Sequence, residues 1–159
     1  MIEINPIGII HTPFTSTKGM PIQPAGADGV KGTVELFEAF HQGLKDLDGF
    51  SHIILLYHFH RSSGFDLQVV PFMDSEPHGL FATRAPRRPN PIGISVVQLN
   101  RIENGVLHVQ NVDILDSTPL IDIKPYVAKF DNVTNLRTGW LEQTGRSVTS
   151  CKADDRFNK

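Results

Sequence analysis

The sequence predicts a mainly β fold, a small closed or curled β-barrel with one principal helix and long functional loops. About seven short apolar runs have the length and patterning of strands. The 159 residues include 13 glycines and 11 prolines, which favour turns over long helices. Hairpins and irregular loops link the runs, and no G-x-G-x-x-G turn occurs, which argues against a doubly wound sheet.

The first third of the chain alternates between strands and loops. Residues 2–11 begin with alternating apolar positions and end in IGII, which predicts a first strand with Pro6 at its edge. Residues 12–29 form a long loop, and loops of this length in a compact domain are often functional. Gln23 is the polar group of this loop that we select as a candidate ligand contact. A second strand is expected over residues 30–36.

The principal helix is expected over residues 38–47. Phe37, Phe40, Leu44 and Leu47 recur at a spacing that places them on one helical face. Such a stripe is typical of core packing, so we assign it no chemistry.

The strongest strand pattern is SHIILLYHFHR, residues 51–61, which is apolar on both faces over 53–57 and therefore central. Alternation places His58 and His60 on the same side of this strand. Two such imidazoles can form half of a metal site, which Glu76, His78 or Asp116 could complete, although the spacing demands none of them. Alternatively, one histidine packs and the other faces a ligand.

The second half of the chain continues the β pattern. Residues 62–79 are irregular, and residues 92–99 form a strand. Glu103-Asn104-Gly105 predicts a hairpin turn into a strand over 106–115. One more strand is expected over 120–130, where Pro125 limits pairing.

One domain is expected over residues 1–143, followed by a polar tail over 144–159 that frays, so that Trp140 is the last packed residue. The net charge of −2 provides no bulk attraction to nucleic acid, so an RNA partner would require a local basic patch. The single cysteine, Cys151, fits a reducing compartment. No apolar run approaches membrane-spanning length and the N-terminus lacks a signal-peptide pattern, so we expect a cytoplasmic protein without a membrane partner.

The stretch FATRAPRRPNPIGIS, residues 81–95, predicts a stiff binding loop. Its prolines fix their own φ angles and push the preceding residues toward extended conformations. Arg84, Arg87, Arg88 and Asn90 are therefore held at set positions, where they could meet a polar ligand without a large ordering cost. The simpler interpretation is a solvated loop punctuated by prolines. We call residues 81–91 the arginine loop.

Two further polar groups follow a predicted strand. The Asp116-Ser117-Thr118-Pro119 turn can bond its own backbone or a polar ligand. Asp122, Lys124 and Tyr126 then alternate and share one strand face, as a solvated edge or as the lining of a substrate cleft.

Several of these stretches resemble the TsaA-like (TrmO-type) S-adenosylmethionine-dependent methyltransferase family. The resemblance extends from about residue 7 to residue 130. The matching segments are IGII-H-TPF, Pro21-Ile22-Gln23, GTVEL, LKDLDGFSHIILLYHFHRS, ATRAPRRPNPIGIS and LDSTPLIDIKPY, in this order.

The resemblance implies a small β-barrel that acts as a homodimer. It implies S-adenosyl-L-methionine as cofactor, bound near the subunit interface by Pro21, Ile22, Gln23, His60, Arg61, Arg84, Ile94, Asp116, Ser117, Thr118 and Pro119. Methyl transfer would be a direct in-line displacement onto a nitrogen of threonylcarbamoyladenosine beside the tRNA anticodon, without a metal. His60 and Asp122 are the candidate bases, and the expected substrate contacts are Arg87, Arg88, Asn90, Lys124 and Tyr126.

Two other functional hypotheses remain open at this point. The chain could be a non-catalytic RNA- or nucleotide-binding barrel, or a His-x-His metalloenzyme. The G-x-S-x-G, H-E-x-x-H and G-x-x-x-x-G-K-[ST] patterns are absent. Longer relatives carry a further C-terminal domain that helps engage tRNA, whereas little follows Trp140 here, which leaves the exact methyl acceptor open.

Overall fold

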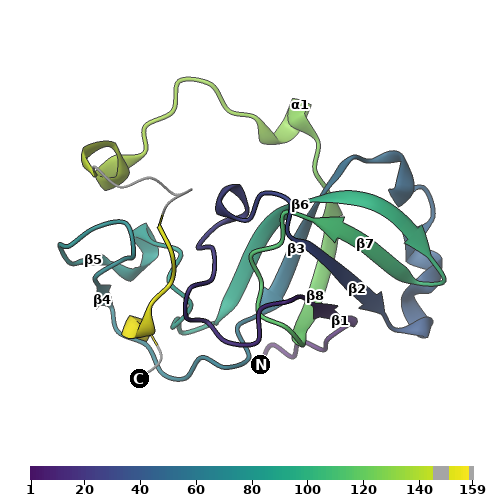
Figure 1. Ribbon diagram of the computed structural model, residues 1–159, viewed down its shortest axis with the longest axis horizontal. Helices are drawn as coiled ribbons and strands as arrows, with labels where there is room; N and C mark the ends of the chain where they lie inside the picture. The colour runs from purple at the N-terminus through teal and green to yellow at the C-terminus, as the bar shows by residue number, and fades with distance from the viewer. Residues whose placement is uncertain (145–150, 158–159) are drawn as a thin grey trace.

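Six strands close into an antiparallel barrel in the order β1-β2-β7-β6-β3-β8 (Figure 1). The computed structural model describes residues 1–144 and 151–157. The barrel strands are β1 Gly8–His11, β2 Lys31–Leu36, β3 His52–His58, β6 Ile92–Glu103, β7 Val106–Gln110 and β8 Thr118–Pro125, and a separate two-stranded sheet contains β4 Gln68–Val69 and β5 His78–Gly79. The predicted mainly β barrel is therefore confirmed.

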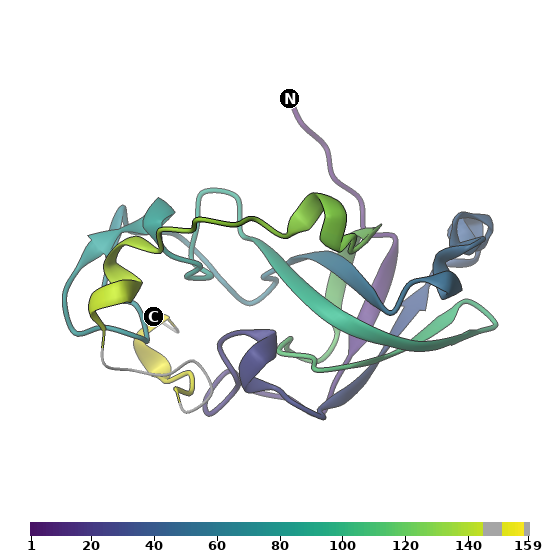
Figure 2. The same ribbon diagram turned by 90° about the horizontal axis from the view of Figure 1, so that it is seen from above.

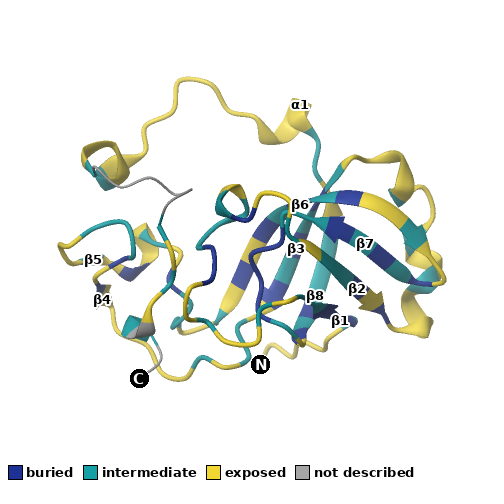
Figure 3. Cartoon of the chain, viewed as in Figure 1, coloured by how far each residue is buried: buried dark blue, intermediate teal, exposed yellow. Residues whose placement is uncertain are grey.

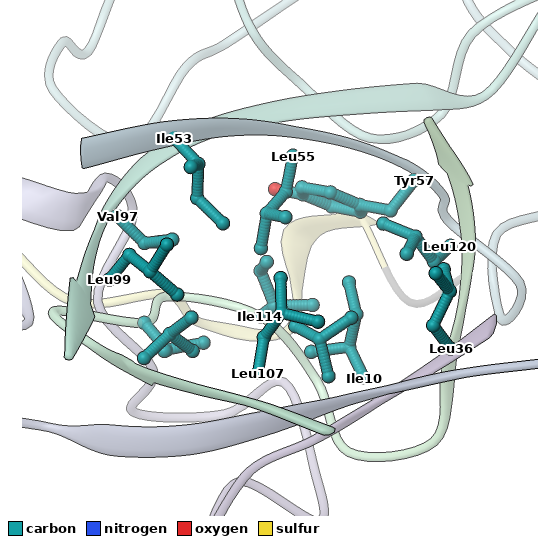
Figure 4. Close-up of a cluster of buried hydrophobic side chains, with 13 residues drawn as sticks. Ile10, Leu36, Ile53, Leu55, Tyr57, Val97, Leu99, Leu107, Ile114 and Leu120 are labelled. Atoms are coloured by element: carbon teal, nitrogen blue, oxygen red, sulfur yellow. The ribbon is translucent and has the colours of Figure 1, made fainter. Parts of the chain in front are cut away.

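The barrel interior is filled by alternate side chains of its strands (Figure 4). On β3, Ile53 and Leu55 are fully buried and Tyr57 is 5% exposed, while the residues between them face outward. The strand lies between β6 and β8, as its two apolar faces predicted. The predicted hairpin is also confirmed, since Asn104 and Gly105 have φ angles of 51° and 77°, both positive as a type I′ turn requires.

The principal helix, η2, is a 3-10 helix rather than an α-helix and ends at Leu44. Asp46 follows with a left-handed φ of 71°, which stops the helix before the expected end at residue 47. Leu44 and Leu47 pack against the core, but Phe37 and Phe40 are 39% and 44% exposed, so the expected core stripe is only half correct. The remaining helical segments are η1 Pro24–Gly26, η3 Leu47–Gly49, η4 Leu80–Ala82, α1 Ala128–Asp131, η5 Gly139–Gln143 and η6 Asp155–Phe157.

The strand registers bring three connections to one end of the barrel. His11, the last residue of β1, pairs with Thr33 near the start of β2. Lys31, the first residue of β2, pairs with Gln110, the last residue of β7, and His58, the last residue of β3, pairs with Ile92, the first residue of β6. The chain therefore leaves β1, β3 and β7, and enters β2 and β6, at the same end of the barrel. The β1–β2, β3–β6 and β7–β8 connections therefore emerge together. The β3–β6 connection extends away from the barrel as a lobe that carries β4 and β5 (Figures 1 and 2).

Residues 151–157 of the polar tail contact both the long loop and this lobe. Gly19 N donates to Ala153 O over 2.8 Å, and Ala153 N donates to Met20 O over 2.9 Å. Phe157 packs against the small cluster of Val69, Leu80 and Ala85. The expectation that Trp140 is the last packed residue was wrong because the polar composition of the tail concealed one apolar anchor.

Between β8 and the tail, the chain crosses from the barrel to the lobe as a largely exposed arm (Figure 3). Trp140 fixes the far end of this arm, since its indole Nε1 donates to Ala82 O over 2.8 Å and its ring stacks on His78 at 4.5 Å. None of the helices in the described part of the chain combines the length and the apolar character needed to span a bilayer.

Candidate functional site

The long loop and the arginine loop meet at the end of the barrel that carries the three connections. Arg84 Nη1 donates to Gln23 Oε1 over 2.6 Å, although the two residues lie 61 positions apart in the sequence. Gln23 is half-buried and Arg84 is exposed. A guanidinium with further donors and an amide are thus presented side by side, a combination suited to a carboxylate or another anionic group.

The Asp116 turn is fastened to the start of the long loop. Thr12 N donates to Asp116 Oδ1 over 3.0 Å, and Asp116 N donates to Phe14 O over 2.7 Å. The Thr12 amide also lowers the pKa of Asp116, so this carboxylate is ionised at neutral pH. Ser117 adopts a left-handed φ of 64°, and Thr118 Oγ1 is buried and donates to Leu115 O. The turn is therefore rigid and holds its carboxylate beside the long loop.

The end of β3 supplies the fourth segment of the site. Arg61 Nη1 donates to Thr15 O over 3.3 Å, which links this segment to the long loop. His60 lies in a turn, because β3 ends at His58. Burial, assisted by the charge of Arg61, lowers the pKa of His60, which keeps its imidazole neutral at neutral pH. A neutral imidazole can accept a proton.

The structure does not support the hypothesis of a His-x-His metal site. His58 and His60 do not share a strand face, since the strand ends between them. His78, one of the possible third ligands, is instead hydrogen-bonded to Asp74 Oδ2 at 2.7 Å. Among residues 1–144 and 151–157, no group of three or more histidine, cysteine or acidic side chains is placed to hold a metal ion.

Two of the three arginines in the arginine loop donate hydrogen bonds to backbone carbonyl oxygens of the chain. Arg88 Nη1 lies between 3.0 and 3.5 Å from the carbonyl oxygens of Leu80, Thr83 and Ala85. Arg87 Nε donates to Ser63 O over 3.0 Å. Arg84 is the member of the group that reaches the long loop. The guanidiniums that we expected to bind substrate thus explain the stiffness of the loop, because they bond its backbone and that of the neighbouring segment.

The other predicted contacts lie on the outer surface of the barrel. Asp122 and Lys124 form an ion pair at 2.8 Å, and they face outward from β8. Ile94 is 46% exposed on β6 and is not a core residue. Tyr126 N donates to His52 O at the start of β3, which places Tyr126 at the opposite end of the barrel from the Asp116 turn. Within one chain, the structure therefore separates Tyr126 from the residues that meet around Gln23.

The remaining predicted positions belong to the segments already described. Pro21 and Ile22 precede Gln23 in the long loop, and Pro21 forms an isolated bridge with Lys152 of the tail. Pro119 lies in the part of β8 that pairs with β1, opposite Ile9. Asn90 is exposed in the arginine loop.

The sequence analysis missed a buried polar network beneath these loops. Ser95 Oγ donates to Asp113 Oδ1 over 2.6 Å, and the Tyr57 hydroxyl lies 2.9 Å from Ser95 Oγ. Burial raises the pKa of Asp113 to about 6, although the hydrogen bond from Ser95 and, to a lesser extent, the charge of Arg84 oppose this rise. Burial also raises the pKa of Tyr57, which stays neutral. The signal was present in the sequence as a lone carboxylate inside the apolar run VDIL, residues 112–115.

Comparisons with known proteins place these residues in a family context. Residues 9–132 match the tRNA-methyltransferase O N-terminal domain family. A probable S-adenosyl-L-methionine-binding protein of Pyrococcus abyssi is 55% identical over 157 residues, covering 99% of this chain and 85% of the relative. A mouse tRNA (adenine(37)-N6)-methyltransferase is 33% identical over 138 residues, which cover 82% of this chain and 32% of the relative.

A solved structure, TrmO from Pseudomonas aeruginosa, superimposes with a TM-score of 0.74 at 40% identity. The match covers 87% of this chain and 62% of that chain. The chain therefore spans less than two thirds of the solved relative and about a third of the mouse enzyme.

Proposed function

Because the chain belongs to the tRNA-methyltransferase O N-terminal domain family, we propose that it is an S-adenosylmethionine-dependent methyltransferase that acts on tRNA. The acceptor is the N6 nitrogen of threonylcarbamoyladenosine beside the anticodon, a choice supported by the mouse relative, whose name specifies adenine 37 and N6. The observation that carries the cofactor site is the hydrogen bond from Arg84 to Gln23, which joins the two loops.

The residues at this end of the barrel fit the chemistry of the proposed cofactor. S-adenosylmethionine supplies, when bound, an electrophilic methyl group on a sulfonium centre. Arg84 and Gln23 offer donors to its carboxylate, and the ionised Asp116 offers an acceptor to its ammonium or hydroxyl groups. Ile94 offers an exposed apolar surface to its base.

The chain accelerates transfer by holding the two reactants in line, because a methyl group on a sulfonium centre needs no covalent intermediate. The proton of the acceptor N6 nitrogen is taken by a neutral base. His60 suits this role better than Asp122, because its lowered pKa keeps it neutral and it lies in the segment that contacts the long loop. Asp122 is engaged with Lys124 on the outer surface.

A methyl-transfer assay tests this function. Purified protein is incubated with labelled S-adenosylmethionine and tRNA that carries or lacks threonylcarbamoyladenosine, and the nucleosides are analysed by mass spectrometry. We expect methyl incorporation only with the modified tRNA. Arg84→Ala should reduce it at least tenfold, whereas Arg101→Ala, which removes an exposed arginine paired with Glu103, should leave it unchanged. Salt-sensitive tRNA binding without incorporation would instead indicate a non-catalytic RNA-binding barrel.

The chain also acts as a homodimer in this proposal. The outer face of β6 exposes Ile92 and Ile94, and neighbouring β3 adds Ile54 and Leu56, which are only half-buried. An apolar face of this kind is suited to contact a second copy of the chain. Light scattering should give twice the monomer mass of 17.7 kDa, and Ile92→Asp should shift the mass toward the monomer. A monomer at micromolar concentration would contradict the dimer.

A further inference from the structure

Phe81 is a large aromatic side chain that the lobe leaves in solvent, at the first position of the arginine loop. Its exposed fraction is 74%, whereas the preceding Leu80 is 1% exposed and packs into the small cluster with Val69 and Ala85. A single exposed apolar residue is ordinary in a folded protein and needs no explanation by itself. The surroundings of Phe81 therefore decide whether the ring has a role.

The backbone that carries Phe81 is held on both sides by side-chain hydrogen bonds. Phe81 is the central residue of η4. On one side of it, Thr83 Oγ1 donates to Leu80 O over 2.7 Å. On the other side, Trp140 Nε1 donates to Ala82 O over 2.8 Å, so the end of the exposed arm is fixed here as well. The ring is thus presented from a rigid backbone, which lowers the ordering cost of binding a ligand.

The guanidinium of Arg88 links the ring of Phe81 to the candidate site. Its Cζ lies 5.9 Å from the ring centroid, a distance at which a cation attracts the face of an aromatic ring. Its Nη1 lies 3.0 Å from Thr83 O and 3.1 Å from Ala85 O, and these residues flank Arg84. Phe81 and Arg84 are three positions apart, so their Cα atoms are separated by at most about 11 Å. The ring therefore lies within reach of a group next to the one bound at the candidate site.

The charge around the ring indicates the kind of ligand that it suits. Residues 81–91 include three arginines and neither aspartate nor glutamate. Arg87 is paired with Asp66 at 3.8 Å, whereas Arg84 and Arg88 donate to neutral oxygens and keep their positive charge. A ligand that combines a flat ring with negative charge complements this surface, and a nucleotide of single-stranded RNA has both. An apolar protein surface would provide no counter-charge for the guanidiniums.

We propose that Phe81 is a stacking platform for an unpaired base of the RNA acceptor, adjacent to the nucleotide that is methylated. The proposal rests on the proposed function for the identity of that RNA. Unpaired bases of RNA loops are recognised by stacking on aromatic side chains, whatever the base. Arg88 holds the ring, and the exposed part of the ring is open to the base. Stacking of this neighbour fixes the register of the loop, so that the acceptor base reaches the cofactor.

The first arm of the test measures RNA binding and needs no cofactor. The probes are two anticodon stem-loop RNAs in which 2-aminopurine replaces the nucleotide before or after the acceptor, because stacking on an aromatic ring quenches its fluorescence. The wild type should bind both RNAs and quench one of them. Phe81→Ala should weaken binding about tenfold and abolish the quenching. Phe81→Trp should retain both properties, and Phe81→Leu, which is apolar but has no ring, should behave like Phe81→Ala.

The matched control is Phe130→Ala, which removes an equally exposed phenylalanine, 77% accessible, from α1. It should bind and quench like the wild type. Because the ring of Phe81 is exposed, Phe81→Ala should also melt at the wild-type temperature, as circular dichroism can verify. Wild-type quenching in Phe81→Ala or in Phe81→Leu would overturn the platform. So would a Phe81→Ala variant whose mass in light scattering falls from dimer to monomer, because Phe81 would then contact a second copy of the chain.

The second arm separates the platform from the proposed function. Phe81→Ala should bind S-adenosylmethionine as tightly as the wild type in calorimetry, and should raise the KM for tRNA about tenfold. Methyl incorporation by the wild type with an unchanged KM in Phe81→Ala would refute the platform and leave the proposed function intact. Quenching that depends on Phe81, in a wild type that transfers no methyl group, would support the platform and refute the proposed function. A wild type that binds no RNA would overturn both.

Discussion

Replacing Asp113 by asparagine should stabilise the folded chain at neutral pH and change its stability little at acid pH. The cause is the cost of keeping the buried carboxylate ionised. Its pKa rises from an ordinary 3.8 to about 6 in the folded chain, so the folded state holds its proton more tightly than the unfolded state. A raised carboxyl pKa contributes stability below pH 3.8, and this contribution is lost as the pH rises through 6.

The size of the effect follows from the same difference in pKa. At about 1.36 kcal/mol per pH unit, the rise from 3.8 to about 6 corresponds to about 3 kcal/mol. For a chain of this length, each kcal/mol shifts the melting temperature by about 2–4 °C, so the variant should melt roughly 6–12 °C higher at pH 7.5. An asparagine retains an acceptor for the hydroxyl of Ser95 and has no charge to bury.

Urea unfolding at pH 7.5 and pH 4, followed by circular dichroism, measures this prediction. The free energy of unfolding of Asp113→Asn should exceed that of the wild type by about 3 kcal/mol at pH 7.5 but by only about 0.6 kcal/mol at pH 4. The exposed control Asp48→Asn should stay within about 0.5 kcal/mol of the wild type at both pH values. A variant that is less stable than the wild type at pH 7.5, or a difference independent of pH, would refute the reasoning.

Three further predictions concern the packing around the site. Gly93→Ala should lower the free energy of unfolding by about 1–3 kcal/mol, because the new methyl group displaces the ring of Tyr57; an unchanged urea midpoint would contradict this contact. Arg88→Ala should destabilise the chain by about 1–3 kcal/mol, because the contacts of Arg88 with backbone carbonyls are lost. It should leave the salt dependence of tRNA binding unchanged, and a reduced salt slope would show that Arg88 contacts phosphate. A chain of residues 1–143 should still unfold cooperatively, and non-cooperative unfolding would refute the proposed domain boundary. Loss of the backbone hydrogen bonds of Ala153 to Gly19 and Met20 should make residues 12–29 more sensitive to limited proteolysis.

Local sequence patterns were sufficient to identify most of the barrel. The apolar run of β3 and the Asn104-Gly105 turn have local causes, since side-chain alternation and positive φ angles act over a few residues. The expected helix was less well predicted, because the left-handed conformation of Asp46 interrupts it although the apolar spacing continues to Leu47. Such an interruption depends on where the chain must turn toward β3, and the periodicity contains no information on this.

The candidate site could be predicted only in part, for reasons of distance along the chain. Gln23 and Arg84 were selected as separate candidates, but their hydrogen bond depends on the barrel registers that bring their loops to one end. The role of Arg88 was also not predictable, because the sequence does not show whether the guanidinium of an arginine binds backbone carbonyls or phosphate. The burial of Asp113 was not predicted because its hydrogen-bond partner, Ser95, comes from a distant segment.

Equilibrium binding of S-adenosylmethionine tests the central claim, which is that loops from three barrel connections form one cofactor site around Arg84. Calorimetric titration of the wild type at pH 7.5 should show saturable binding in the micromolar range, about −8 kcal/mol. Arg84→Ala should weaken it at least tenfold and Arg101→Ala should not. Wild-type protein that gives no saturable binding, or an Arg84→Ala variant that binds as tightly as the wild type, would contradict the account.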